Sequence, residues 1–229
     1  MGESKRRFDR FLSTGEGTDR LQFFSDAVFA IAMTLLVVEI TVPVLKDPTD
    51  GELWSALLGE WERFFAYALS FAVIGISWMG HHRRFRLIRR YDGGLIRINL
   101  LLLLLVAFVP FPTSLISEYG SLVPAAVSYA ATVAAIGLVQ MWTWAYAYRR
   151  RLTEESVTPE LFRYVVRTQA VTPAVFLLSI PIAFLVGGYW PLWFWILSWP
   201  LGAIVGRWEP KARPGAGDTP TSGTRPPFD

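Results

Sequence analysis

From Arg20 to Glu39 the chain reads RLQFFSDAVFAIAMTLLVVE. Between these two charged ends the only ionisable side chain is Asp26, and most of the other side chains are apolar. A helix needs about 20 predominantly apolar residues to cross a bilayer, because each residue adds about 1.5 Å along the helix axis. The stretch therefore predicts a membrane-spanning helix that carries one carboxylate within its apolar length.

Five more apolar runs of similar length follow along the 229-residue chain. Only 18% of the residues are charged, which is below the roughly 25% that is usual for soluble domains. We therefore predict an all-α membrane protein with six transmembrane helices per chain. The predicted spans are residues 21–45, 64–80, 98–117, 122–148, 168–186 and 189–206.

These spans form a single transmembrane domain, residues 20–206, because no internal repeat divides them. A basic N-terminal segment, residues 1–19, precedes the domain, and a Pro- and Gly-rich tail that we predict to be disordered, residues 207–229, follows it. Of the 22 Lys and Arg residues, all but Lys46 and Arg63 fall on one predicted side of the membrane. The positive-inside rule then places both termini in the cytoplasm, in a cell membrane.

Proline and glycine positions give local expectations within the spans. Each proline inside a span removes a backbone donor and should bend its helix. These prolines are Pro110, Pro112, Pro173 and Pro181. Gly75 and Gly80 in the second span would let helices approach one another closely. The chain has no cysteine, which excludes disulfides and thiolate chemistry.

Asp26 is the most informative charge in the sequence. An ionised carboxylate inside a membrane costs up to ~3 kcal/mol unless it faces a partner or water, so Asp26 should face the bundle. Asp26 either belongs to a functional site or vestibule, or it is an internal strut, a structural residue that binds a polar group on a neighbouring helix. The candidate partners lie at the same cytoplasmic depth and are His81, His82, Arg83, Arg84 and Asn99.

A stripe of apolar residues follows Asp26 on the first predicted helix. Ile31, Leu35 and Val38 are spaced i, i+4 and i+7, so they share one face, with Thr34 beside them. The spacing alone does not distinguish a lipid-facing stripe or a packed stripe from one that lines a pore.

Three motifs resemble the bacterial transmembrane protein 175 family of lysosomal-type potassium channels. The first-helix stretch carries Arg20, Phe24, Ser25 and Asp26 in that family's pattern. The second predicted span closes on Trp78-x-x-His81-His82, and the third begins with Asn99. The resemblance is close over the first half of the chain, whereas the last three spans match the family only in their general apolar character.

The resemblance implies a homotetramer around a central pore, with potassium as the permeant ion and no cofactor, metal, catalytic residue or nucleic acid partner. Each subunit would contribute its first helix, and Ile31, Leu35 and Val38 would form the constriction. Thr34 would supplement selectivity with its hydroxyl group. The remaining motif residues would form a network that ties the first helix to the second and third; they are Arg20, Phe24, Ser25, Asp26, Trp78, His81, His82 and Asn99. Val38 is smaller than the leucine often found at that position.

The chain lacks the Thr-Val-Gly-Tyr-Gly loop that builds a carbonyl-lined potassium filter. Selectivity would therefore come from a hydrophobic ring that favours the less tightly hydrated ion and that gates by dewetting. Two other functions stay open at this stage: a proton or cation carrier that uses Asp26 with His81 or His82, and a non-conducting scaffold. Ser77 and His81 are four residues apart, but no oxyanion element accompanies them, so we do not expect an enzyme.

Overall fold

The structure of the chain is a computed structural model, which describes residues 15–16, 19–46, 48–187 and 195. The predicted tail, most of the predicted sixth span and most of the N-terminal segment lie outside the described residues. Of the sixth span, only Trp195 is described.

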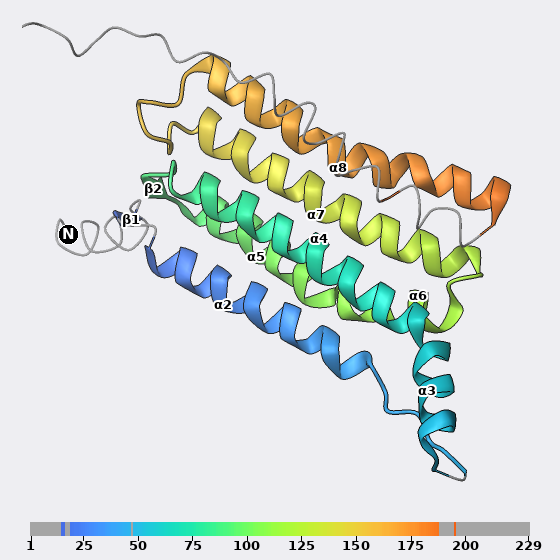
Figure 1. The fold of residues 1–229 in the computed structure, drawn as a ribbon. Coiled ribbons are helices and arrows are strands. Elements are labelled where there is room, and N and C mark those ends of the chain that lie inside the picture. The colour runs from blue at the N-terminus through green and yellow to red at the C-terminus, as the bar shows by residue number, and fades with distance from the viewer. Residues whose placement is uncertain (1–14, 17–18, 47, 188–194, 196–229) are drawn as a thin grey trace, which may run out of the picture.

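Within the described residues the chain is a bundle whose long helices run side by side (Figure 1). Five of its helical stretches are long and apolar enough to cross a membrane. The helices are α2 (Asp19–Leu35), η1 (Leu36–Glu39), α3 (Asp50–Gly59), α4 (Trp61–Phe85), α5 (Gly93–Phe108), α6 (Pro110–Tyr119), α7 (Val123–Arg149) and α8 (Pro159–Val186). Two short strands, β1 (Gly15–Glu16) and β2 (Arg90–Tyr91), pair antiparallel at one end of the bundle.

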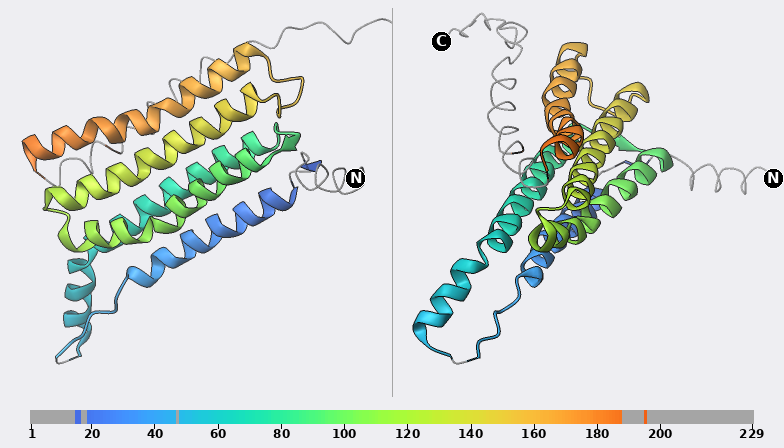
Figure 2. Two further views of the ribbon diagram at one scale, coloured as in Figure 1. Left: turned by 180° about the vertical axis from the view of Figure 1, so that it is seen from behind. Right: turned by 90° about the vertical axis from the view of Figure 1, so that its right-hand side faces the viewer.

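The helices form a layered arrangement in which α2 and α8 lie at opposite edges (Figures 1 and 2). The helix α2 packs on α4 and α5, and α7 packs on α5 and along the length of α8. One buried cluster lies between α2, α4 and α5 and includes Phe29, Leu36, Ile74 and Leu102. The bundle therefore has a core that runs along the helices, as a multi-pass membrane protein requires.

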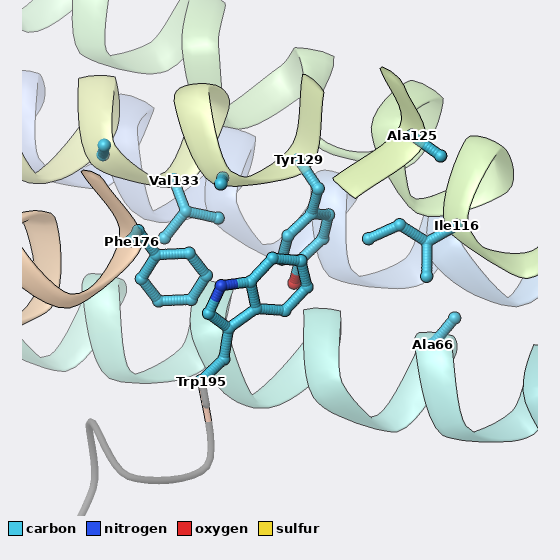
Figure 3. Close-up of a cluster of buried hydrophobic side chains, with 9 residues drawn as sticks. Ala66, Ile116, Ala125, Tyr129, Val133, Phe176 and Trp195 are labelled. Carbon is cyan, nitrogen blue, oxygen red and sulfur yellow. The ribbon is translucent and has the colours of Figure 1, made fainter. Parts of the chain in front are cut away.

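A second buried cluster joins α4, α6, α7 and α8 (Figure 3). At its centre the ring of Trp195 stacks 4.9 Å from the ring of Tyr129 and 5.1 Å from that of Phe176. The Trp195 indole nitrogen also donates to Ser179 Oγ at 2.9 Å. Trp195 from the predicted sixth span is thus buried against α7 and α8.

The first helical stretch is shorter than the predicted span of residues 21–45. The α-helix ends at Leu35, a 3₁₀ turn continues to Glu39, and the backbone is extended at Ile40. Pro43 lacks a backbone donor and disfavours helical geometry at Val42, which favours the extended backbone that follows the 3₁₀ turn. The separate helix α3, which the sequence patterns did not predict, follows with Thr49 Oγ1 capping the Glu52 N–H at 3.2 Å.

The prolines act differently in the two spans that contain them. The predicted third span is divided at Val109 into α5 and α6, because Pro110 offers no N–H to the preceding turn. By contrast, α8 remains one helix across Pro173 and Pro181. The helices α4 and α8 extend several residues beyond the predicted spans of residues 64–80 and 168–186, whereas α7 is shifted by only one residue from the predicted span of residues 122–148.

The expectation about glycines was wrong in its choice of positions. A Cβ added at Gly75 would meet nothing within 4 Å, and one at Gly80 would meet the Arg84 guanidinium of the same helix. One close approach between helices is at Gly137 on α7, where a Cβ would lie 2.9 Å from Cδ of Pro173 on α8, and another is at Gly94 on α5, where a Cβ would overlap the Tyr146 hydroxyl of α7. The bulky proline ring on α8 explains why that position of α7 has no side chain.

Candidate functional site

The helix α2 has two distinct faces. Ser25, Phe29 and Ala32 are almost completely buried where α2 packs on α4 and α5, and Leu36 at the start of η1, which packs on α4 and α6, is buried on the same side. Their spacing of three or four residues places them on one side of the helix. The opposite side is exposed, so the bundle of a single chain leaves one whole face of α2 without a packing partner among the described residues.

The predicted stripe lies on that exposed face. Ile31 is 57% exposed, Leu35 46% and Val38 70%. Since η1 is a 3₁₀ turn with about 3 residues per turn, Val38 lies directly above Leu35 along the helix axis. The Thr34 side chain is also exposed, and its hydroxyl donates to the Ile31 carbonyl oxygen at 2.8 Å. The lone pairs of the Thr34 oxygen therefore remain available on the exposed face.

Asp26 lies at the border between the two faces and contacts α4. Trp78 donates its indole N–H to Asp26 Oδ1 at 2.7 Å, and Nδ1 of His82 lies 3.5 Å from Oδ2. The same Nδ1 is 2.9 Å from the amide nitrogen of Gln22. Of the partners proposed from sequence for Asp26, the structure therefore brings only His82 close to it. Trp78 was noticed as part of a motif, but its role as the hydrogen-bond donor was missed.

A second contact between α2 and its neighbours lies one residue before Asp26. Asn99 on α5 donates from Nδ2 to Ser25 Oγ at 2.9 Å, and neither residue is exposed. The Ser25 hydroxyl in turn donates to the Leu21 carbonyl oxygen at 2.8 Å. Asn99 thus binds Ser25 rather than Asp26. These contacts connect α2 to α4 and to α5 at the same depth.

The two adjacent histidines point into different surroundings. His81 is 1% exposed, and its ring lies 5.4 Å from that of Phe29 and 4.2 Å from that of Phe85. Its Nε2 has no hydrogen-bond partner among the described residues. Only His82 faces the carboxylate of Asp26, so a site that combines Asp26 with both histidines is not formed in this chain.

Arg20 and Phe24, the other motif residues, are exposed. Neither side chain joins the hydrogen bonds between α2, α4 and α5 within the described part of the chain. Arg83, another residue considered for Asp26, is also exposed.

Arg84 forms a buried polar site that the sequence analysis missed. Its Nη2 donates to Gln140 Oε1 on α7 at 2.8 Å. The Gln169 amide on α8, with its oxygen turned toward α4, accepts from Arg84 Nε at 3.1 Å. Gln140 also donates to Ser77 Oγ at 2.7 Å, so Ser77 is held by an amide and not by His81. The sequence did contain a signal for this polar site, because Gln140 and Gln169 are polar residues that lie within the predicted apolar spans of residues 122–148 and 168–186.

Charged residues gather at the end of α2 that lies opposite its N-terminus. The Glu39 carboxylate accepts a hydrogen bond from Ser114 on α6, and Arg63 donates to Thr41. A hollow of about 460 Å³ lies at the junction of α3, α4 and α6 and is lined in part by Glu60, Glu62 and Glu118. The described residues contain no group of three His, Asp or Glu side chains placed to hold a metal ion.

Known proteins match this chain in sequence. The family model described as endosomal/lysosomal potassium channel TMEM175 matches residues 20–110. A potassium channel from Streptomyces collinus is 45% identical over 130 residues, which cover 55% of this chain and 62% of that channel. A potassium channel from Chamaesiphon minutus is 39% identical over 174 residues, which cover 73% of this chain and 85% of that one.

A solved structure matches the fold as well. The crystal structure of a lysosomal potassium-selective channel TMEM175 homolog from Chamaesiphon minutus superposes with a TM-score of 0.68 at 34% sequence identity. The match covers 83% of this chain and 96% of that one, so it extends beyond the three motifs at the start of the chain.

Proposed function

Because the chain belongs to the TMEM175 family of ion channels and is not an enzyme, we propose that it is a potassium-selective, leak-type channel. Four copies assemble around a central axis, and each copy contributes α2 to the pore. The protein lies in the cell membrane with both termini in the cytoplasm, as the distribution of its basic residues favours.

The observation that supports this proposal most directly is the exposed stripe of Ile31 and Leu35 on α2 and Val38 on η1. An exposed apolar face of a membrane helix contacts either lipid or another subunit. Ala27 and Ala30 lie on the exposed side of the same helix, and small residues of this kind are typical of close helix contacts in membranes. A face that combines small residues with a hydroxyl-bearing Thr34 suits a subunit contact around a pore better than a lipid contact.

In such a pore the narrowest point is a ring of apolar side chains, which offers no ligand to an ion. A cation that passes must keep its water or lose part of it at a cost, and that cost is larger for Na⁺, which is hydrated more tightly than K⁺. The ring also controls conduction by wetting and dewetting, since small changes in radius decide whether water fills it. The Thr34 hydroxyl oxygens supply the polar groups nearest to this ring.

The contacts behind the stripe give α2 a fixed position. Ser25 is bound by Asn99 on α5, and Asp26 is bound by Trp78 on α4. Both bonds lie about one and a half turns before Ile31, the first residue of the stripe, so they hold the start of the pore helix against the bundle. In this proposal Asp26 is a strut and does not coordinate the ion.

Reconstitution of the purified full-length protein into planar bilayers tests this function. A potassium-selective channel gives discrete single-channel currents whose reversal potential follows the K⁺ gradient. When Na⁺ replaces K⁺ on one side of a symmetric K⁺ solution, this reversal potential moves away from zero, toward the K⁺ equilibrium potential. The contact between His82 and Asp26 favours one alternative, a carrier in which this pair binds and releases a proton. Slow, saturating flux without unitary currents would support that carrier and contradict the channel.

A further inference from the structure

Six exposed arginines lie at two connections at one end of the bundle. Arg86, Arg89 and Arg90 belong to the connection between α4 and α5. Arg149 is the last residue of α7, and Arg150 and Arg151 begin the connection to α8. We call these six residues the arginine platform. The described residues of both connections contain no lysine.

Backbone hydrogen bonds join the two connections into one unit. The N–H groups of Arg89 and Arg90 both donate to the Leu152 carbonyl oxygen, at 2.9 and 3.2 Å. In the other direction, the N–H of Glu154 donates to the Leu87 carbonyl oxygen at 2.9 Å. The platform is therefore a shared surface that presents arginines from two parts of the sequence at set positions.

The unit also rests on a small apolar core. Phe85, Leu95, Ala147 and Leu152 are buried beneath it. The backbone of Arg151 has a φ of 55°, an unusual left-handed value for a residue other than glycine, and the Leu152 N–H bonds to the Ala147 carbonyl oxygen at 2.9 Å directly after it. The turn at Arg151 reverses the chain after α7, so that Leu152 reaches the connection between α4 and α5.

The positive charge of the platform is poorly balanced within the chain. Among the described residues, Arg150 is the only one of the six with a carboxylate within 4 Å, since its Nε lies 3.8 Å from Asp92 Oδ2. The Tyr146 hydroxyl and the Asp92 carboxylate raise the pKa of Arg150, so this residue stays charged. Glu154 and Glu155 are the exposed acids of the second connection.

The position of the platform identifies its partner. It lies where α4 and α7 end and where α5 and α8 begin, which is the level of the lipid headgroups for a chain that crosses a membrane (Figure 1). The planar guanidinium group matches a phosphate with two parallel hydrogen bonds, whereas a lysine offers only a point charge. We infer that the arginine platform binds the phosphate groups of anionic phospholipids and that these lipids stabilise the folded channel.

Thermal unfolding of the full-length protein in an uncharged detergent tests this inference without any measurement of ion flux. Added phosphatidylglycerol should raise the melting temperature in a saturable way, and phosphatidylcholine should not, because a ligand that binds only the folded state stabilises it. The combined change Arg86→Gln, Arg89→Gln and Arg149→Gln should remove at least half of that rise. The matched control is Lys46→Gln, because Lys46 is an exposed basic residue at the opposite end of the bundle. This variant should keep the whole rise in melting temperature.

Several outcomes would overturn the inference. An equal rise with phosphatidylcholine would show that headgroup charge is not recognised. The same rise with inorganic phosphate at matched ionic strength would identify free phosphate as the ligand. An undiminished rise in the triple variant would place the lipid elsewhere. If the triple variant does not fold, Arg89→Gln alone decides the question by native mass spectrometry, where it should retain fewer phosphatidylglycerol molecules per chain than Lys46→Gln; equal numbers would contradict the inference.

Discussion

Trp78 on α4 donates its indole N–H to the carboxylate of Asp26 on α2, over 2.7 Å. The acceptor is a charge inside the first apolar helix, and the donor comes from a helix that begins more than twenty residues later. A hydrogen bond to a charged group in such surroundings contributes more than one between neutral groups. It explains how the bundle tolerates a carboxylate at this depth.

Trp78→Phe should destabilise the protein, because it removes the donor to Asp26 and keeps an aromatic ring in the same space. We expect a loss of about 1–2 kcal/mol in the free energy of unfolding. Thermal or denaturant unfolding in detergent measures it. Trp54→Phe on α3, where the side chain is 67% exposed, is the control and should change little. Equal stability of the two variants would show that the bond to Asp26 contributes nothing.

Ser25 and Asn99 should be energetically coupled. Their bond joins α2 to α5 across a fully buried contact, so each alanine variant removes the same interaction. A double-mutant cycle of Ser25→Ala and Asn99→Ala should give a coupling energy of about 0.6 kcal/mol, the average for hydrogen bonds inside membranes, and at most about 1.7 kcal/mol. Additive losses in the double variant would contradict direct coupling.

Leu35→Ala should lower the preference for K⁺ over Na⁺ under the proposed function, because a smaller side chain widens a hydrophobic ring and lets both ions keep their water. Reversal potentials under mixed K⁺ and Na⁺ gradients should move toward zero. Leu178→Ala is the matched control, since Leu178 is 60% exposed on α8 at the opposite edge of the bundle. If Leu35→Ala leaves the reversal potential unchanged, Leu35 does not line the pore.

Gly137→Ala should destabilise the contact between α7 and α8. The new methyl group would lie 2.9 Å from the ring of Pro173, which is closer than a carbon contact allows. Overpacking of this kind costs about 1–3 kcal/mol. Gly75→Ala, where the methyl group meets nothing within 4 Å, should instead be neutral or raise stability by up to about 1 kcal/mol through helix propensity. A loss of similar size in both variants would contradict the close approach at Gly137.

Arg84→Lys should also be destabilising, although it keeps the charge. The guanidinium reaches Gln140 on α7 and Gln169 on α8 at once, and a lysine ammonium group cannot reproduce this fork. We expect a loss of about 1.5–3 kcal/mol, the range for hydrogen bonds to charged groups. The neighbouring Arg83→Lys is the control, because Arg83 is exposed. Equal melting temperatures of the Arg84→Lys and Arg83→Lys variants would show that Arg84 does not connect α4 to α7 and α8.

Much of the architecture follows from composition along the chain. Apolar runs of spanning length predict helices wherever they occur, because a backbone inside a bilayer has to satisfy its own hydrogen bonds. The end of the first helix was harder to predict, since the apolar run continues to Leu45 while Pro43 and the β-branched residues before it favour extended backbone. Helix α3 was missed because its ten residues are too few and too mixed in character to form a spanning run.

The site residues likewise divide into features that the sequence could predict and features that it could not. The motif that contains Ser25, Asp26 and Asn99 could be recognised in the sequence, but its internal pairing could not. Asp26 had five plausible partners on two helices, and only the packing of α4 against α2 brought His82 and Trp78 to its carboxylate. Arg84 was expected near the first helix, yet its side chain turns toward α7 and α8.

By itself, the sequence determined that this chain is a multi-pass helical membrane protein and that its first helix contains one carboxylate, and it predicted that most of the positive charge lies on one side of the membrane. These properties depend on local composition, since the transfer of each segment into the bilayer depends on its own side chains. Only the tertiary structure decided that Asn99 binds Ser25, that Trp78 binds Asp26 and that Ile31, Leu35 and Val38 remain exposed. Such pairings join residues more than fifty positions apart, and they depend on how the helices rotate and approach, which no single segment specifies.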